Sequence, residues 1–159
     1  MSQDATFEDG GERPLRLRAV DAEDLPVLSA LAQDAVFPAS EMRWHRAQRR
    51  FAILLNRFRW EDKEDATRRA RPVERVQTVL SVDDVQAVAT SGVPRGDKDI
   101  ILSVLAIEFT PTEDGCGTVL VTLAGDGALR IEVEALDVSL TDVTRPYIAP
   151  SRKAPQHPN

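Results

Sequence analysis

The sequence is poor in the residues on which most catalytic and metal sites depend. Of its 159 residues one is cysteine and two are histidine, and aromatic residues make up only 5%. A single cysteine, Cys116, excludes a disulfide framework within the chain. His45 has no His or Cys partner at a metal-ligand spacing, and His157 lies close to the last residue. Because nucleophile-elbow and P-loop motifs are also missing, we expect no catalytic residues of the usual kinds, no metal ion and no cofactor.

Long hydrophobic runs are absent as well. Runs such as 52–55 and 104–107 are far shorter than the roughly 20 apolar residues that a membrane helix needs. The first thirteen residues are polar and acidic, whereas a secretory signal has an apolar centre. With the lone cysteine, these absences predict a cytoplasmic protein that has no membrane partner.

The composition is that of an ordinary globular domain, with 42% hydrophobic and 29% charged residues. A chain of this length fits one domain with a core large enough to need no disulfide or metal. Residues 1–12 and 149–159 lack apolar periodicity, and we expect them to be disordered tails. The domain is therefore predicted to span residues 13–148.

Charge is unevenly distributed along the chain. The formal net charge is −6, yet residues 43–75 hold ten Arg and one Lys against five acidic residues. This asymmetry fits a match between basic and acidic faces, within one chain or between subunits. It also fits a site for an anionic partner. The overall acidity disfavours general affinity for nucleic acid, because the field of the whole molecule repels phosphate.

The clearest structural pattern is a β-hairpin near the C-terminus. Over 119–123, Val119, Val121 and Leu123 alternate with Leu120 and Thr122, and over 129–133 apolar residues alternate with Arg130 and Glu132, on either side of Gly125-Asp126-Gly127. Alternation of period two places one set of side chains in a core, and the Gly-Asp-Gly sequence supplies a tight turn. A third extended or helical segment is expected to follow, up to Leu140.

Elsewhere the pattern predicts one principal helix, Asp21 to Val36, with Asp21 or Asp24 as its cap and Phe37-Pro38 at its end. The other predicted strands are 15–18, the central strand within 42–60, 76–82, 85–90 and 100–109, with loops at 61–71, 92–97 and 111–117. The predicted core residues of the sheet are Phe51, Ile53, Leu105, Ile107, Val121, Leu123, Ile131 and Val133.

These elements define an α+β fold with a mainly antiparallel sheet of about six to seven strands. The segment from Phe51 to about residue 88 resembles the segment from Leu102 to Val133, each with three predicted strands. Two such three-stranded repeats would build a sandwich or a barrel, with the helix packed on it.

The opening strand and helix, Leu15 to Leu28 with Asp24-Leu25-Pro26, resemble the start of the GNAT acetyltransferases. That resemblance implies acetyl-CoA binding through an Arg/Gln-x-x-Gly-x-Gly/Ala loop at a helix N-terminus. The sequence departs from this pattern, because Gly115-Cys116-Gly117 follows Thr112 and precedes a predicted strand.

Across most of residues 15–147 the chain resembles an alphaproteobacterial family catalogued as domain of unknown function 2948. The matching positions are Leu17, Ala19, Asp21, Asp24, Leu25, 33–36, 50–52, 56–61, Leu102, Ser103, 105–107, Phe109, Val133, Glu134 and 140–142. Several separated blocks agree in order, so the resemblance is specific. It implies no particular activity.

The best candidate for a functional surface is the segment 43–60, where arginine and aromatic residues are interleaved. Its candidate residues are Arg43, Trp44, Arg46, Arg57, Arg59 and Trp60. If these residues form an interaction surface, the four arginines lie exposed on one face beside Trp44 or Trp60.

Three roles remain open for this segment. Phe58 and Trp60 can be core residues, with the arginines paired to acidic residues of 61–65. Trp and Arg are also enriched at protein interfaces, and Arg beside aromatic rings can bind nucleic acid. We expect a non-catalytic binding or adaptor protein whose partner is a protein, with a second copy of the chain as one candidate. The alternatives are a relative of the acetyltransferases and a nucleic-acid-binding protein, of which we consider the latter less favoured.

Overall fold

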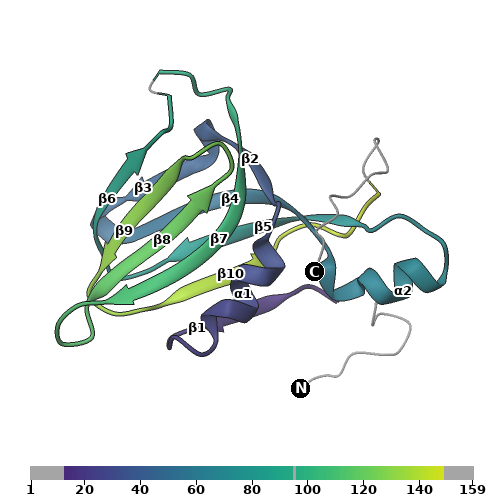
Figure 1. Ribbon diagram of the computed structural model, residues 1–159, viewed down its shortest axis with the longest axis horizontal. Helices are drawn as coiled ribbons and strands as arrows, with labels where there is room; N and C mark the ends of the chain where they lie inside the picture. The colour runs from purple at the N-terminus through teal and green to yellow at the C-terminus, as the bar shows by residue number, and fades with distance from the viewer. Residues whose placement is uncertain (1–12, 95, 149–159) are drawn as a thin grey trace.

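The computed structural model describes residues 13–94 and 96–148, and its ten strands form one antiparallel sheet (Figure 1). The strands are β1 (Arg16–Ala19), β2 (Val36–Pro38), β3 (Met42–His45), β4 (Arg50–Phe58), β5 (Arg75–Val82), β6 (Val85–Ser91), β7 (Ile101–Pro111), β8 (Gly117–Leu123), β9 (Ala128–Val133) and β10 (Val138–Asp142). The helices are α1 (Leu25–Ala32) and α2 (Lys63–Arg68), and the short 3-10 turns are η2 (Ala39–Glu41), η3 (Arg46–Gln48) and η4 (Trp60–Asp62). The expected tails 1–12 and 149–159 lie outside the described residues.

The strand order is β1-β10-β5-β4-β2-β7-β8-β9-β6, and β3 pairs with the first half of β4 beside β2. The short strand β2 joins the two halves of the sheet, because it pairs with β4 on one side and with β7 on the other. Buried residues of β4, β5, β8 and β9 belong to one core cluster, so the sheet curls around a single core (Figure 1). The curled sheet is not closed, since β1 and β6 remain its two ends.

The predicted hairpin is confirmed. β8 and β9 pair in antiparallel register, and their apolar positions are buried while the alternate positions are partly or fully exposed. The turn between them has positive φ at Gly125 (81°) and at Asp126 (70°), the conformation that the Gly-Asp-Gly sequence favours. The third segment is extended and forms β10.

β4 is central, as predicted, with β5 along one side and β3 and β2 along the other. Its residues Phe51, Ile53 and Leu55 are buried in the core. Ala52 and Leu54 remain partly exposed on the opposite face, so the sheet is covered by a second layer on one face only.

The predicted helix from Asp21 to Val36 is too long, because α1 covers only Leu25–Ala32. The Asp21 carboxylate accepts hydrogen bonds from the backbone N–H groups of Glu23 and Asp24, and it stabilises a turn before the helix. Asp34 has a φ of 66°, which no helix tolerates, and its N–H donates to the carbonyl of Val104. The chain therefore leaves the helix early and becomes strand β2, where sequence reasoning placed the end of the helix.

Leu105 is not a core residue, because its side chain is 40% exposed. The register between β7 and β8 shifts between Val104 and Ala106, which identifies Leu105 as the extra residue of a β-bulge. Val104 and Ile107 are both buried on either side of it. The other predicted core residues are all buried.

Three further predictions need correction, two about the sheet and one about the charged stretch 61–71. The sheet has ten strands instead of six to seven, because β2, β3 and β10 are separate strands. The three-strand repeat exists only as β7, β8 and β9, since β5 lies beside β10 and β6 pairs with β9. The charged stretch 61–71 is not a loop throughout, because it contains α2.

Candidate functional site

A groove lies between β3 with its following turn η3 and the edge strand β6. We call it the β3–β6 groove, and its volume is about 580 Å³. The lining residues are Trp44, Arg46, Arg49, Val85, Gln86, Ala87 and Val88. Two of the predicted surface residues, Trp44 and Arg46, are thus brought together here.

Both strands beside the groove have a free edge. Among the described residues β6 pairs only with β9, and β3 pairs only with β4. An edge strand presents backbone N–H and C=O groups that can pair with another extended chain. The groove therefore offers main-chain hydrogen-bonding groups as well as side chains.

The groove ends where β6 begins. The N–H of Val85 donates to the carbonyl of Arg49 over 2.9 Å, which ties the start of β6 to the turn between β3 and β4. Arg49 adopts the left-handed conformation with a φ of 56°, which lets the chain reverse into β4. Nearby, the N–H of Glu134 donates to the carbonyl of Asp84 over 3.0 Å.

The cations of the groove differ in their partners. Arg49 forms an ion pair with Glu134 at the groove's end. The guanidinium of Arg46 lies over the ring of Trp44, 5.8 Å from its centroid, and forms no ion pair with any carboxylate of the described residues. Trp44 itself is half-buried and packs against the core, so the ring is a fixed platform for the guanidinium.

Arg43 lies on the other face of β3. Met42 and Trp44 pack against the core, and Arg43 alternates with them and is exposed. Arg43 is therefore next to the groove in sequence but is not part of its lining.

Arg57 is fully buried, so the expectation that it lies on a surface is wrong. Its guanidinium donates two hydrogen bonds of 2.8 Å to Glu61 and bonds of 3.0 and 3.1 Å to the carboxylate of Asp142. It also donates to Thr78 Oγ1 over 3.0 Å and to the carbonyl of Phe58 over 3.1 Å. A guanidinium whose donors are engaged inside the protein holds elements together and is not available to a partner.

These contacts shift the pKa values of the buried pair. Burial by itself would lower the pKa of Arg57, but the hydrogen bonds and the charges of Glu61 and Asp142 together outweigh it and raise that pKa. Burial by itself would raise the pKa of Glu61, but the hydrogen bond and the charge of Arg57, a backbone hydrogen bond and the charge of Arg59 together outweigh it and lower that pKa. Both groups are held in their charged forms.

Arg59 is buried too, with 4% of its surface exposed, and it pairs with Asp62 and Glu74. The indole N–H of Trp60 donates to the carbonyl of Gln33 over 2.9 Å, and its ring lies 5.2 Å from that of Phe58. The pairing of these arginines with acidic residues of 61–65 was one of the roles that the sequence left open, and it is confirmed for Arg57 and Arg59.

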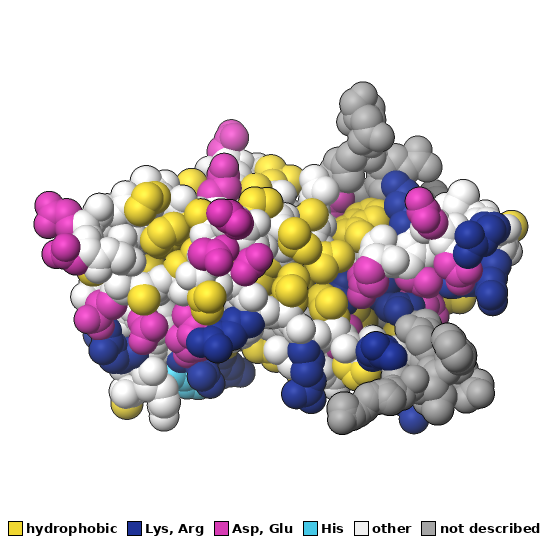
Figure 2. All heavy atoms as spheres, turned by 90° about the horizontal axis from the view of Figure 1, so that it is seen from below, with side chains coloured by type: hydrophobic (Ala, Val, Ile, Leu, Met, Phe, Trp, Pro, Cys, Tyr) yellow, Lys and Arg dark blue, Asp and Glu magenta, His cyan; other side chains and the backbone are white. Residues whose placement is uncertain are grey.

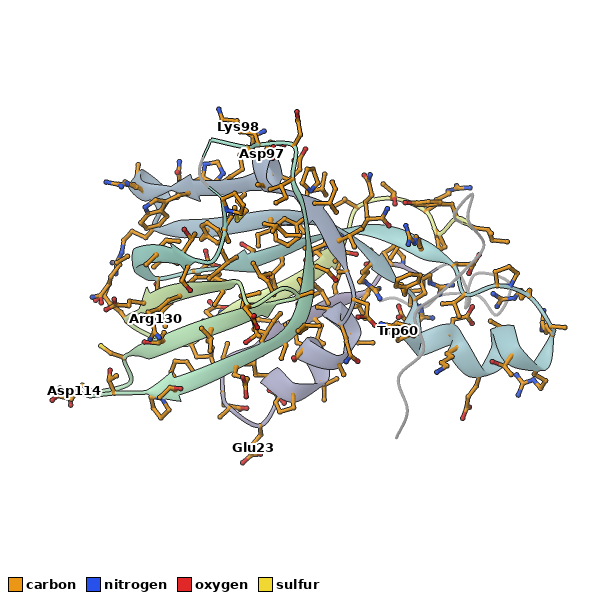
Figure 3. All side chains as sticks on the ribbon, turned by 45° about the horizontal axis from the view of Figure 1, so that its top comes forward. Glu23, Trp60, Asp97, Lys98, Asp114 and Arg130 are labelled. Carbon is orange, nitrogen blue, oxygen red and sulfur yellow. The ribbon has the colours of Figure 1, made fainter. Side chains whose placement is uncertain are left out.

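The six predicted surface residues do not form one surface. Arg46 and Trp60 flank opposite ends of β4, which spans nine residues or about 26 Å. Figure 3 places Trp60 at the end of the sheet nearest α2, away from β3 and β6 in Figure 1. Sequence reasoning missed the contribution of β6, because nothing in 85–91 shows that this strand lies across from Trp44.

Two other hollows have fewer side chains that could bind a charged ligand. One runs between α1 and β7, where exposed Leu105 adds to an apolar face interspersed with acidic side chains (Figure 2). The other lies over β2, β4 and β5 and includes Asn56, whose buried Oδ1 accepts no hydrogen bond from the described residues. Neither hollow is lined by a cation. The hollow beside α1 has one carboxylate in its lining, Glu108, and the hollow over β4 has one, Glu41.

Across residues 13–94 and 96–148, no cluster of three or more His, Cys, Asp or Glu side chains could hold a metal ion. Cys116 is half-buried in the turn before β8, and His45 is exposed at the end of β3. No helix among these residues has the length and the apolar character to cross a membrane.

Comparison with known proteins gives one match. The family model described as "Protein of unknown function (DUF2948)" matches residues 15–157, which agrees with the resemblance seen in the sequence. Neither the curated proteins nor the solved structures contain a match to the chain.

Proposed function

Because the chain belongs to the DUF2948 family, whose description names no activity, we propose a function from its own geometry. The protein is a non-catalytic binding module that accepts an extended, acidic segment of a partner protein in the β3–β6 groove. The segment lies along β6 as an additional antiparallel strand. The cytoplasmic location stays a prediction, as does a second copy of the chain as the partner.

One observation carries this proposal: the free edge of β6 opens into the same groove that holds Trp44 and Arg46. An extended peptide that adds to a sheet edge gains main-chain hydrogen bonds, while pockets for alternate side chains give specificity. Trp44 supplies a partly exposed apolar surface, and Val88 adds a second one on β6. Tryptophan and arginine are the residues that most often dominate the binding energy of interfaces.

The charge of the groove selects the chemistry of the segment. Arg46 has no carboxylate partner among the described residues, and Arg43 and Arg50 lie close to it in sequence. Arg50 is engaged with Asp83 at 2.7 Å, and Arg49, the other arginine of the groove lining, is paired with Glu134. Arg46 is therefore the cation available inside the groove. Carboxylate side chains on the partner would complement it and would speed the association.

The two alternative functions have less support. Acetyl-CoA binding by GNAT enzymes needs a phosphate-binding loop that leads into a helix, whereas 115–117 lead into strand β8. Nucleic-acid binding needs several exposed cations on one surface, and Arg57 and Arg59 are buried.

The proposal can be tested by peptide titration of the uniformly ¹⁵N-labelled full chain. The probe is a seven-residue peptide with Glu at every second position, Val or Thr between, an acetylated N-terminus and a free C-terminus. We expect saturable amide shifts confined to β3, η3 and β6, with a dissociation constant below about 1 mM.

Two control peptides separate the contributions. A peptide with N-methyl groups on alternate amides keeps the side chains but loses main-chain donors, and we expect it not to bind. A peptide with Lys in place of Glu should bind at least tenfold more weakly, since the charge complementarity is reversed. If the N-methylated peptide bound as well as the parent, or if the parent caused no shifts in the groove, the proposal would be wrong. Tight binding of single-stranded DNA to the same amides would favour the nucleic-acid alternative instead.

A further inference from the structure

The geometry points to the C-terminal carboxylate of the partner segment as the group that the groove recognises, with Arg46 as its ligand. This inference rests on the proposed strand addition to β6. It adds a direction, because the segment runs antiparallel to β6 and ends beside η3. It also adds a chemical requirement, because the segment must end there in a free carboxylate.

The first support is that the groove is closed at one end. Three backbone hydrogen bonds tie the loops together at that end: Val85 to Arg49 (2.9 Å), Asp83 to Asp137 (2.9 Å) and Glu134 to Asp84 (3.0 Å). An extended chain that follows β6 toward its first residue therefore meets bonded backbone at Val85. A chain terminus fits this place better than a continuing chain, which would have to turn out of the groove.

The second support is the polarity of β6. The strand starts at Val85, at the closed end, and runs to Ser91. Each neighbouring pair in this sheet is antiparallel, including β6 with β9. A strand added to β6 in the same manner runs toward Val85, so its C-terminus arrives at the closed end. In the parallel orientation an N-terminal amine would arrive there instead.

The third support is the charge at the closed end. η3 contributes Arg46 and is followed by Arg49, and both side chains line the groove. Because Glu134 already pairs with Arg49, the unpaired positive charge beside η3 is that of Arg46. This charge would repel an amine and attract a carboxylate. Charge and strand polarity therefore select the same orientation.

Arg46 is better suited to the carboxylate than Arg49. Arg49 is paired with Glu134, so a ligand would have to displace an existing ion pair. Arg46 contacts the face of Trp44 and no described carboxylate, and its guanidinium edge has donors to offer. A guanidinium binds a carboxylate through two parallel N–H···O bonds, which fixes direction as well as charge.

The test compares the same acidic peptide with a free C-terminus and with a C-terminal amide. For the unaltered protein we expect amidation to weaken binding about tenfold, which corresponds to about 1.4 kcal/mol. In Arg46→Gln, the free acid should bind about as weakly as the amide, and amidation should have less than a twofold effect. The matched control is Arg43→Gln on the opposite face of β3, where the tenfold effect of amidation should persist.

A spin label reports the direction. A nitroxide next to the C-terminal residue should broaden the amide signals at the start of β6, at Gln86, and a label at the N-terminus should broaden those near Ser91. If acid and amide bind equally well, carboxylate recognition is wrong while strand addition stands. If the broadening pattern is reversed, the direction is wrong. If neither peptide binds, the proposed function itself fails.

Discussion

Replacement of Arg57 by Met is expected to lower the free energy of unfolding by about 3–5 kcal/mol. The guanidinium is completely buried and connects β4 to Asp142 of β10, Thr78 of β5 and Glu61 beyond the end of β4. Without it, the carboxylate of Asp142, whose side chain is only 2% exposed, loses its cation inside the protein. Glu61 is 29% exposed and can return to water, so most of the loss is assigned to Asp142.

The size of this loss is large relative to the stability of a domain, which is typically about 5–15 kcal/mol. Met is the chosen replacement because it is unbranched and apolar and leaves little empty space, which keeps the effect of lost packing small. The measurement is urea unfolding followed by tryptophan fluorescence.

The matched control is Arg46→Met, the same substitution at an exposed arginine, which should change stability by less than about 0.5 kcal/mol. A second comparison isolates the effect of the charge on Asp142, which is buried without a cation in Arg57→Met. Arg57→Met combined with Asp142→Asn should be more stable than Arg57→Met alone, because the amide carries no charge. Its oxygen can still accept the hydrogen bond from the N–H of Leu15, and its NH2 group can donate to the hydroxyl oxygen of Thr78. The reasoning is refuted if Arg57→Met costs less than about 1 kcal/mol, or if the added Asp142→Asn change brings no recovery.

Two further outcomes follow from the fold. Ile107→Asp should prevent folding, because Ile107 is buried. Leu105→Asp should leave the thermal unfolding temperature nearly unchanged, because the bulge turns Leu105 outward. Similar effects of the two substitutions would contradict the bulge. The pKa of Glu61 is lowered in the folded protein, because the hydrogen bond and the charge of Arg57 and two smaller contributions together outweigh burial. Its contribution to stability is therefore present above its ordinary pKa of 4.5 and is lost as pH falls through the folded value. Urea unfolding at pH 7 and below pH 4 should therefore show a loss of stability that is smaller in Arg57→Met, and an equal loss in both proteins would exclude this origin.

The sequence predicted what depends on neighbouring residues. Alternation identified β8 and β9, and the short distance in sequence between Arg57 and Glu61 allowed their pairing to be considered. The strands of 76–82 and 85–90 were also located correctly, within a residue or two. Each of these features is decided within a few residues of chain.

What the sequence did not show depends on distant partners. Asp142 lies 85 residues from Arg57, so the burial of this arginine could not be read from the segment around it. The bulge that turns Leu105 outward is set by its register with β8, and the local pattern of β7 is apolar at that position too. The β3–β6 groove likewise arises only because the curled sheet brings the start of β6 to the turn after β3.

The two ends of β4 therefore separate two roles that the sequence presents as one. At the end near α2, arginines are buried, paired with carboxylates, and joined to three other elements. At the end near η3, the guanidinium of Arg46 lies over the ring of Trp44, beside the edges of β3 and β6 that are free of any described strand. A buried and fully bonded guanidinium affects stability, whereas an exposed one beside a free edge affects association. The interleaving of arginine and aromatic residues along 43–60 is thus not one binding motif, and only its first part faces a place where a partner can bind.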